Sequence, residues 1–393
     1  MNQSDNLHIV LAGGGTAGHV NPLLSIAQCI RRLEPQAQIS VIGTSAGLES
    51  RLVPQAGFEL DTIEKVPFPR SLAPSNLMFP ARFMKQLKTV KEIFQRRQAD
   101  VVVGVGGYAA APAYVQAHSM RIPLVIHEQN ARAGMANKLG ARWAQYVGVT
   151  YDDCGLTARA HTQVERVGLP LRTVISERAA ALEKDRGEAK RAAALELGLD
   201  PDIPIVAITG GSLGAVNVNT AVANASHELL SGAQVVHLTG KGKSASVRAV
   251  VSALAGENVL SDLGSSDGDY HIAEYWENMD AVMAAADLVI CRSGAGTVAE
   301  LTALGIPAVY VPLPIGNGEQ SFNAQPVVNA GGGIMVHDDE FTAAWIRQHV
   351  VPLLADKDKL SAMSAIAWNY GKRDAAEKMA HTIIDLAYAA RTK

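Results

Sequence analysis

The chain has 393 residues, enough for two or three domains, and 48% of them are hydrophobic, so it can bury sizeable cores. Its net charge of −3 gives no global reason to expect a nucleic-acid partner. The three cysteines are far apart and form no CxxC pair, which argues against a zinc site or a disulfide framework and favours a reducing compartment. We expect no signal peptide, and no run of 18 apolar residues predicts a membrane-spanning helix.

Short β-branched runs alternate with longer helical patterns along the chain. The runs in the first half are LHIVLAG, QISVIGT, DVVVGVGG and PLVIHEQ, and those in the second half are PIVAITGG, QVVHLTG, DLVICRSG and PAVYVPL. Continuous apolar strands followed by amphipathic helices are typical of parallel sheets that are covered on both faces. The sequence therefore predicts an α/β protein.

The two halves of the chain resemble each other. LHIVLAGGGTAGHVNP in the first half matches PIVAITGGSLGAVNVN in the second, and each is followed by another strand that ends in glycines, VVVGVGGYAAAP or LVICRSGAGTVAE. The matching order and spacing predict two similar domains, covering residues 1–170 and 171–371. The last segment, residues 372–393, has Met379, Ile383 and Leu386 on one face of a predicted helix, which by pattern alone could pack on either domain.

Residues 13–18 contain the G-x-G-x-x-G spacing of a dinucleotide-binding loop, followed at once by His19. A dehydrogenase would need an acidic residue at the end of the next strand, and neither QISVIGTSAG nor PAVYVPLPIG, which follows the second glycine motif at residues 294–299, supplies one. A glycine turn at a helix N-terminus still suits a phosphate. Two such domains facing each other predict a transfer reaction between two diphosphate-bearing substrates.

Glu300 lies one turn along the helix that begins at SGAGT, where its carboxylate could accept hydrogen bonds from a ribose diol. The alternative is a solvent-facing glutamate that the helix dipole favours. Arg292 and the polar run at residues 319–325 follow neighbouring strands and favour the ribose-binding interpretation.

Five motifs in order, GGGTAGHVNP, HEQNARAG, GGSLGA, CRSGAGTVAE and the EQSFNA segment, resemble the MurG family of glycosyltransferases. The resemblance covers nearly the whole chain. It implies a GT-B fold of two Rossmann-like domains, with the acceptor on the first domain and UDP-GlcNAc on the second. It also implies an inverting transfer of GlcNAc to undecaprenyl-diphosphoryl-MurNAc-pentapeptide, lipid I to lipid II, at the cytoplasmic face of the bacterial membrane in peptidoglycan synthesis. The family's final helix crosses back to the first domain.

The resemblance also assigns residues. His19 is the first candidate for the general base, with Glu128 and His127 as alternatives, and a phosphate-binding role for His19 is equally open. Gly14, Gly15 and Tyr108 are expected to bind the acceptor. Thr16, Gly18 and Asn130 belong to the same motifs of the acceptor side and are also expected to contact the donor. The remaining donor residues are Arg172, Ser212, Arg292, Ala295, Gly296, Thr297, Glu300, Gln320 and Asn323.

Three positions depart from the family pattern. Leu213 stands where GGSQGA has an amide, Glu319 replaces the first glutamine of a QQ pair, and Gly296 stands where leucine is frequent. No Asp-x-Asp run lies near the donor motifs, so we expect no metal and no cofactor. Arg292 and the helix N-terminus at residues 294–297 are then expected to stabilise the leaving diphosphate.

Residues 70–92 combine apolar and cationic side chains. Leu77, Met78 and Phe79 belong to an apolar loop cluster, and a helix is expected after Pro80. On that helix Phe83 lies near Lys85 and Lys88, which suits the surface of an anionic bilayer. The alternative is an ordinary helix with a buried apolar face and solvated lysines. Cell-wall synthesis and division proteins are further implied partners.

Two other functions remain open from the sequence. One is a different GT-B enzyme that acts on a UDP-sugar, such as an epimerase, which would need no lipid acceptor. The other is a non-catalytic nucleotide-sugar-binding protein, which would bind UDP-GlcNAc without turnover.

Overall fold

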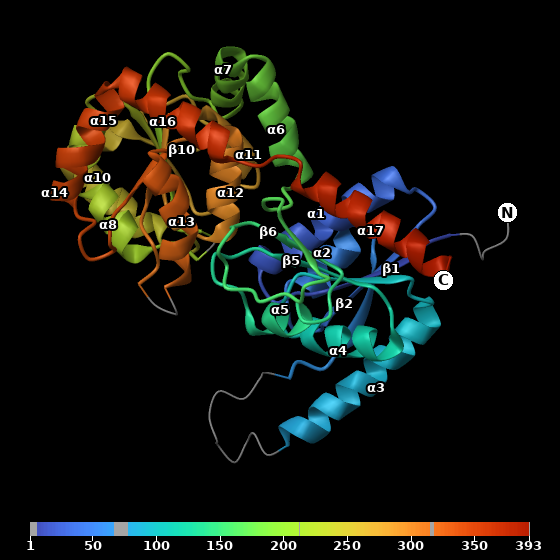
Figure 1. Ribbon diagram of the computed structural model, residues 1–393. Coiled ribbons are helices and arrows are strands. Elements are labelled where there is room, and N and C mark those ends of the chain that lie inside the picture. The colour runs from blue at the N-terminus through green and yellow to red at the C-terminus, as the bar shows by residue number, and fades with distance from the viewer. Residues whose placement is uncertain (1–5, 67–77, 212, 315–317, 393) are drawn as a thin grey trace. The chain divides into compact units, whose positions relative to one another are not determined.

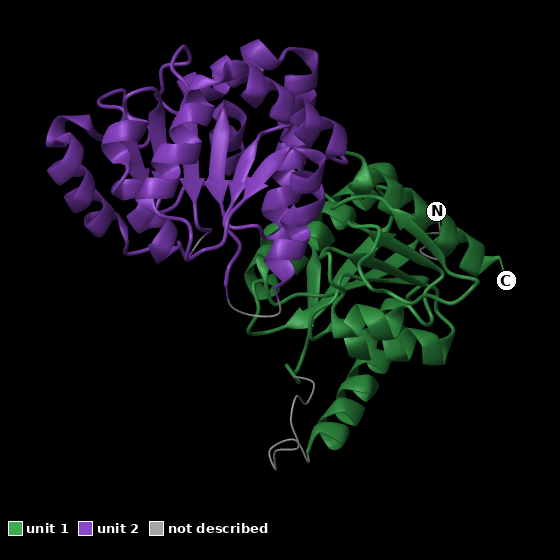
Figure 2. Ribbon diagram, turned by 60° about the vertical axis from the view of Figure 1, so that its left-hand side comes forward, with its two compact units in different colours: residues 1–172, 373–393 green, residues 173–372 purple. Residues whose placement is uncertain are grey.

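The computed structural model describes residues 6–66, 78–211, 213–314 and 318–392 (Figure 1). The chain forms two compact units (Figure 2): unit 1 comprises residues 1–172 with 373–393, and unit 2 comprises residues 173–372. Each unit contains a seven-stranded sheet in which every strand pair is parallel. The predicted α/β class with two Rossmann-like domains is therefore confirmed.

Unit 1 has its first strand in the middle of the sheet, in the order β3-β2-β1-β4-β5-β6-β7. Its elements in chain order are β1 (His8–Ala12), α1 (Ala17–Leu33), β2 (Gln38–Thr44), α2 (Glu49–Gln55), β3 (Glu59–Ile63), α3 (Phe79–Arg97), β4 (Val101–Gly104), α4 (Ala110–Met120), β5 (Leu124–Glu128), α5 (Met135–Gly140), β6 (Tyr146–Val149), β7 (Gln163–Arg166) and α17 (Ala375–Arg391).

The sheet of unit 1 has a buried apolar layer on each face, because successive side chains of a strand point to opposite sides. Ile9 and Leu11 of β1 belong to one layer, and Val10 and Ala12 belong to the other. The helices α1 and α17 pack together on the first face, where Met379 and Ile383 are fully buried. The helices α3 and α4 cover the second face.

Unit 2 repeats this arrangement in the order β10-β11-β9-β8-β12-β13-β14. Its elements in chain order are α6 (Thr173–Lys184), α7 (Arg186–Glu196), β8 (Ile205–Thr209), α8 (Val216–Ala223), α9 (Ser226–Leu229), β9 (Gln234–Leu238), α10 (Ser244–Ala255), η3 (Glu257–Val259), β10 (Leu260–Asp262), β11 (Tyr270–Ala273), α11 (Met279–Ala285), β12 (Leu288–Cys291), α12 (Ala295–Leu304), β13 (Ala308–Tyr310), α13 (Glu319–Ala330), β14 (Gly333–Met335), α14 (Ala343–Trp345), η4 (Ile346–Val350), α15 (Val351–Ala355) and α16 (Lys357–Tyr370).

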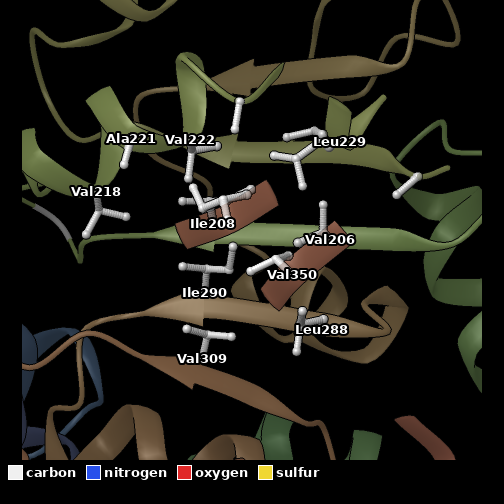
Figure 3. Close-up of a cluster of buried hydrophobic side chains, with 14 of the residues drawn as sticks. Val206, Ile208, Val218, Ala221, Val222, Leu229, Leu288, Ile290, Val309 and Val350 are labelled. Carbon is white, nitrogen blue, oxygen red and sulfur yellow. The ribbon is translucent and has the colours of Figure 1, made fainter. Parts of the chain in front are cut away.

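Figure 3 shows the apolar layer on one face of this sheet. Val206 and Ile208 of β8 and Ile290 of β12 point toward side chains of the covering helices, among them Val222 of α8 and Val350 of η4. All five are fully buried. This packing holds the central strands rigidly, and therefore fixes the loops that leave their carboxyl ends.

The strand orders define one switch point in each sheet. β1 pairs with β2 on one side and with β4 on the other, and β8 pairs in the same way with β9 and β12. In open α/β sheets, ligands bind beyond the carboxyl ends of the strands at such a point. The predicted glycine motifs follow β1, β4, β8 and β12, so all four lie at these two switch points.

Candidate active site

The first glycine loop connects β1 to α1 and has a backbone that only glycine adopts readily. Gly14 and Gly15 have φ of 145° and 100°. A Cβ at Gly13 would overlap Val105, whereas one at Gly15 would meet nothing within 4 Å. Thr16 and Gly18 are exposed at the start of α1. The loop is thus tightly packed beneath and open above, as a phosphate-binding turn needs to be.

A second glycine loop, after β4, lies directly against the first. A Cβ at Gly107 would overlap the carbonyl oxygen of Gly14, so the two backbones touch. A Cβ at Gly106 would lie 3.3 Å from Nε2 of His19. The predicted residues Gly14 and His19 are therefore brought together with a loop from a neighbouring strand. Tyr108 in that loop is 37% exposed and has the ammonium of Lys65 over its ring at 4.7 Å.

His19 is a partly buried histidine in the first turn of α1. Its Nδ1 lies 3.1 Å from Oγ1 of Thr16. Burial lowers the pKa of His19 below its usual range, and the negative charge of Glu49 partly opposes this effect. The imidazole is therefore neutral at neutral pH, which is the form that can accept a proton.

Glu128 belongs to a buried network that supports the second glycine loop. The Gly106 amide donates to the hydroxyl of Tyr114 at 3.2 Å, the hydroxyl donates to Oδ1 of Asn137 at 2.8 Å, and Nδ2 of Asn137 donates to Glu128 at 2.9 Å. The carboxylate also accepts from the amides of Asn130 and Gly134. Burial raises the pKa of the Glu128 carboxyl, although these donors oppose it.

These contacts correct the interpretation of Glu128 as a general base. Its side chain is 1% exposed and both of its oxygens are occupied, so it has no direct access to a substrate hydroxyl. The geometry assigns it instead to the support of the second glycine loop. Asn130, which was predicted to contact substrate, is partly buried, and its backbone amide donates to this carboxylate.

The interpretation of His127 as a base also needs correction. The side chain is fully buried, and its Nε2 is 2.8 Å from the carbonyl oxygen of Gly168, to which it donates. Its Nδ1 faces the side-chain amide of Gln129 at 3.3 Å. Burial lowers the pKa of His127 to about 4, and the bond to Gly168 acts in the opposite direction. His127 is thus a neutral internal contact, and of the three candidates only His19 is partly exposed.

In unit 2 the loop after β8 forms a similar glycine turn. Gly211 and Gly214 have φ of 82° and 70°, and the Gly214 amide donates to the Gly211 carbonyl at 2.8 Å. Leu213 is 80% exposed, and its carbonyl accepts from Nζ of Lys243 at 2.8 Å. Leu213 therefore contributes its backbone to the turn while its side chain faces outward. Ser212, a predicted donor residue, lies outside the described residues.

The N-terminus of α12 is open in the manner expected of a diphosphate site. Its N-cap is Gly294, which has no side chain to cap the helix, and a Cβ at Gly294 or Gly296 would meet no atom of the described residues within 4 Å. Ala295 is buried, whereas Thr297 and Glu300 are partly buried on the same helix. The structure thus places the predicted helix residues around the positive end of a ten-residue helix dipole.

Two residues of α13 that were predicted to bind the donor hold the loop before α12 by hydrogen bonds to its backbone. Oε1 of Gln320 accepts from the amides of Ser293 and Leu313, at 3.2 and 3.0 Å. Asn323 is fully buried and donates from Nδ2 to the Ser293 carbonyl at 3.3 Å. The expectation that Asn323 contacts UDP-GlcNAc is therefore corrected, because the side chain is enclosed. It holds the turn that precedes α12.

The structure also changes the role of Arg292. Its Nη1 donates to the carbonyls of Val311 and Pro312, at 3.0 and 3.1 Å, and lies 2.5 Å from a carboxylate oxygen of Asp338. Its side chain is largely buried. The carboxylate of Asp338 compensates the guanidinium charge of Arg292, which was expected to stabilise the leaving diphosphate. Through its bonds to Val311 and Pro312, Arg292 connects the end of β12 to the end of β13. Arg172, the last residue of the first segment of unit 1, is partly buried.

The candidate membrane residues are divided between exposed and buried positions. Met78 and Met84 are more than 60% exposed, and Lys85 and Lys88 are exposed. Phe79 and Phe83 are partly buried and stack with ring centroids 5.5 Å apart.

The helix that carries them, α3, starts at Phe79 rather than after Pro80, because proline is tolerated in a first turn. Leu77 lies outside the described residues. Figures 1 and 2 show the N-terminal end of α3 projecting away from the rest of unit 1. Within the described part of the chain, no helix has the length and apolar character that a bilayer crossing requires.

Several residues of the site were not predicted from the sequence. Glu49, Tyr114 and Asn137 support the glycine loops of unit 1, and Asp338 pairs with Arg292 in unit 2. Glu49 follows β2 by five positions, in the region where a ribose-binding acid was sought. Its carboxylate instead accepts from Gly15 and Thr44. In the described residues, no group of three or more His, Cys, Asp or Glu side chains could hold a metal ion.

Two family models match successive parts of the chain. Residues 9–149 match the glycosyltransferase family 28 N-terminal domain, and residues 205–379 match the glycosyltransferase family 28 C-terminal domain. Together these matches cover well over half of the chain.

Individual proteins are similar over nearly the full length. A protein of Bifidobacterium adolescentis, named UDP-N-acetylglucosamine–N-acetylmuramyl-(pentapeptide) pyrophosphoryl-undecaprenol N-acetylglucosamine transferase, is 63% identical over 98% of both chains. The crystal structure of Acinetobacter baumannii MurG is 25% identical, with a TM-score of 0.75, over 96% of this chain and 99% of that one. A UDP-GlcNAc 2-epimerase from Neisseria meningitidis, 15% identical with a TM-score of 0.67 over 96% of this chain and 100% of that one, shares the fold. The chain belongs to glycosyltransferase family 28 and, within it, to the MurG group of N-acetylglucosamine transferases.

Proposed function

We propose that the protein transfers GlcNAc from UDP-GlcNAc to undecaprenyl-diphosphoryl-MurNAc-pentapeptide, the step from lipid I to lipid II in peptidoglycan synthesis. The observation that carries this proposal is the 63% identity, over 98% of both chains, to a transferase named for this reaction. The glycine loops at the two switch points supply the chemistry that two diphosphate-bearing substrates need.

On unit 1, the acceptor diphosphate binds above the first glycine loop, which is formed by Gly14 and Gly15, and contacts the exposed residues Thr16 and Gly18 at the start of α1. A hydroxyl of MurNAc lies beside Nε2 of His19, on the edge of the ring that lies near Gly106. His19 removes the hydroxyl proton while the oxygen forms a bond to the anomeric carbon of GlcNAc. The lowered pKa of His19 supports this role, because the imidazole is neutral before the reaction.

On unit 2, the UDP diphosphate binds at the N-terminus of α12. The bond between the anomeric carbon and the UDP oxygen breaks as the new bond forms on the opposite face, so the configuration inverts. The growing negative charge on the diphosphate is stabilised by the helix N-terminus, next to the open positions Gly294 and Gly296. Glu300, one turn further along, accepts hydrogen bonds from the ribose hydroxyls.

The acceptor's lipid tail requires a membrane surface, and we propose that unit 1 supplies the contact through α3. The exposed side chains Met78, Met84, Lys85 and Lys88 combine apolar and cationic character, which suits an anionic interface. Phe83 and Phe79, which are partly buried on the same helix, stack on each other. The protein would then act as a peripheral protein of the cell membrane, at its cytoplasmic side and near cell-wall synthesis and division proteins.

An assay with radiolabelled UDP-GlcNAc and a lipid-linked MurNAc-pentapeptide acceptor tests the proposal. Label should appear in the lipid product, and only when acceptor is present. The fold is also that of UDP-GlcNAc 2-epimerases. Conversion of UDP-GlcNAc to an epimer without acceptor would contradict a transferase, and binding without any turnover would indicate a nucleotide-sugar-binding protein.

A further inference from the structure

Glu49 is a charged side chain buried beneath the first glycine loop, with 1% of its surface exposed. One of its carboxylate oxygens accepts from the amide of Gly15 at 2.7 Å. The other accepts from the amide and the hydroxyl of Thr44, at 2.9 and 2.8 Å. The carboxylate thus connects the end of β2 to the loop that follows β1.

The space around this side chain is enclosed by glycines from three segments of unit 1. A Cβ at Gly14, Gly43 or Gly47 would overlap atoms of the Glu49 side chain. These glycines come from the loop after β1, from β2 itself and from the turn before α2. Their shared partner explains why none of the three positions has room for a side chain.

The carboxylate is held in its ionised form. Burial acts to raise the pKa of Glu49, but hydrogen bonds from Gly15 and Thr44 outweigh it, and the pKa lies below its usual range. An ionised carboxylate only accepts hydrogen bonds, so all three donors must point toward it.

This arrangement decides which amides of the loop are available to a ligand. The Gly15 amide points inward to Glu49. The amides of Ala17 and Gly18, in the first turn of α1, make no hydrogen bond within the described chain. An anion above the loop can therefore bind these two amides but not that of Gly15.

We propose that Glu49 is a positioning residue for the acceptor: it fixes the first glycine loop so that the acceptor diphosphate binds at Ala17 and Gly18, beside His19. This inference rests on the function proposed above. Glu49 touches neither substrate. It acts through the backbone of Gly15, and its charge also partly opposes the lowering of the His19 pKa.

Substitution by glutamine tests this assignment with little change in volume. If the glutamine oxygen faces Thr44, its NH₂ group faces the Gly15 amide, and two donors then oppose each other. In that orientation, which keeps both hydrogen bonds from Thr44, the Gly15 amide loses its acceptor and the loop is no longer held in one conformation. Glu49→Ala removes the hydrogen bonds from both Gly15 and Thr44.

Asp100 offers a matched control. Its largely buried carboxylate also accepts from a backbone amide, that of His8 at 2.7 Å, and it pairs with Arg391. His8 lies at the opposite end of β1 from the glycine loop. Asp100→Asn should therefore lower the stability of unit 1 without altering the acceptor site.

The experiment measures transfer kinetics with a short-chain soluble acceptor, UDP-GlcNAc binding by calorimetry, and hydrogen–deuterium exchange over residues 13–19. For Glu49→Gln we expect kcat/KM for the acceptor to fall at least tenfold, with the Kd for UDP-GlcNAc within twofold of wild type. Exchange over residues 13–19 should become faster. Asp100→Asn should leave all three values close to wild type.

Unchanged acceptor kinetics in Glu49→Gln would overturn the proposal, as would an equal loss in Asp100→Asn. If Glu49→Ala fails to fold, the glutamine variant still decides. Absence of transfer in the wild-type protein would instead contradict the proposed function. In that case the exchange rate over residues 13–19 still reports whether Glu49 fixes the loop, and unchanged exchange in Glu49→Gln would contradict that part on its own.

Discussion

Oγ1 of Thr16 lies 3.1 Å from Nδ1 of His19, so the ring is tethered on one side while its other nitrogen lies beside Gly106. A tethered imidazole with a free second nitrogen has the geometry of a general base. His19→Ala should therefore reduce kcat by about a hundredfold or more. The KM for UDP-GlcNAc should change little, because Thr297 and Glu300, which are proposed to bind UDP, are in unit 2.

Steady-state kinetics with both substrates check this prediction. His161→Ala is the control, since His161 is exposed in the same unit and should leave kcat unchanged. Near-normal turnover in His19→Ala would exclude both the base and the phosphate-binding role.

The pH dependence follows from the lowered pKa of His19. A general base works when it is neutral, so activity should be constant above the ordinary histidine pKa of about 6.5. It should fall as pH decreases through the pKa of His19, which lies below that value because burial outweighs the charge of Glu49. A profile of kcat against pH measures the midpoint. A midpoint above pH 7 would be inconsistent with a buried neutral imidazole as the base.

The sequence predicted the repeated framework but not the internal supports of the site. The strand ending at Ala12 and the glycines after it have local patterns, as does the helix containing Met379 and Ile383. The burial of Asn323 depends on the Ser293 carbonyl, 30 positions away, and no local pattern reports such a pair. The edge strand β7 was also difficult to predict, because its sequence QVER has few apolar residues.

Glu128 illustrates the same limit. From sequence it is an acidic residue after a strand, which suits a catalytic role. Its actual environment is set by Asn137 of α5, which donates to the carboxylate and is itself held by the hydroxyl of Tyr114 from α4. A carboxylate becomes a base or a support according to the donors around it, and these are known only once the helices are placed.

Glu300 should affect the donor alone. Loss of hydrogen bonds from a charged group to the ribose costs about 1.5–3 kcal/mol, so Glu300→Ala should raise the KM for UDP-GlcNAc about ten- to hundredfold. The acceptor KM should stay nearly constant. Glu257→Ala, which removes an exposed acid from the same unit, is the control. An unchanged donor KM would refute the ribose assignment.

Leu213 should be tolerant of substitution. Its side chain is 80% exposed, while its carbonyl accepts from Lys243. Leu213→Gln preserves that backbone contact and the turn between Gly211 and Gly214, so activity should change only modestly. Kinetics at several UDP-GlcNAc concentrations check this. A large gain would show that an amide side chain at this position contributes to donor binding.

The cationic face of α3 should be needed for membrane-embedded acceptor only. Lys85, Lys88 and Lys91 are exposed at intervals of three residues, so they lie along one side of the helix. Each contributes about 1 kcal/mol near an anionic surface. Changing all three to Glu should lower the affinity for anionic vesicles, measured by co-sedimentation, by about a hundredfold or more. It should also slow transfer to acceptor embedded in those vesicles.

Activity on a short-chain soluble acceptor should be retained in this triple variant, because the buried face of α3, formed by Val90, Ile93 and Phe94, is unchanged. A variant with Lys357, Lys359 and Lys372 changed to Glu carries the same charge difference on exposed positions of unit 2, and separates a local effect from net charge. It should bind vesicles more tightly than the α3 variant. An equal loss of vesicle binding in both variants would indicate that α3 is an ordinary surface helix with solvated lysines. An equal loss of transfer to the soluble and the membrane-embedded acceptor would indicate the same.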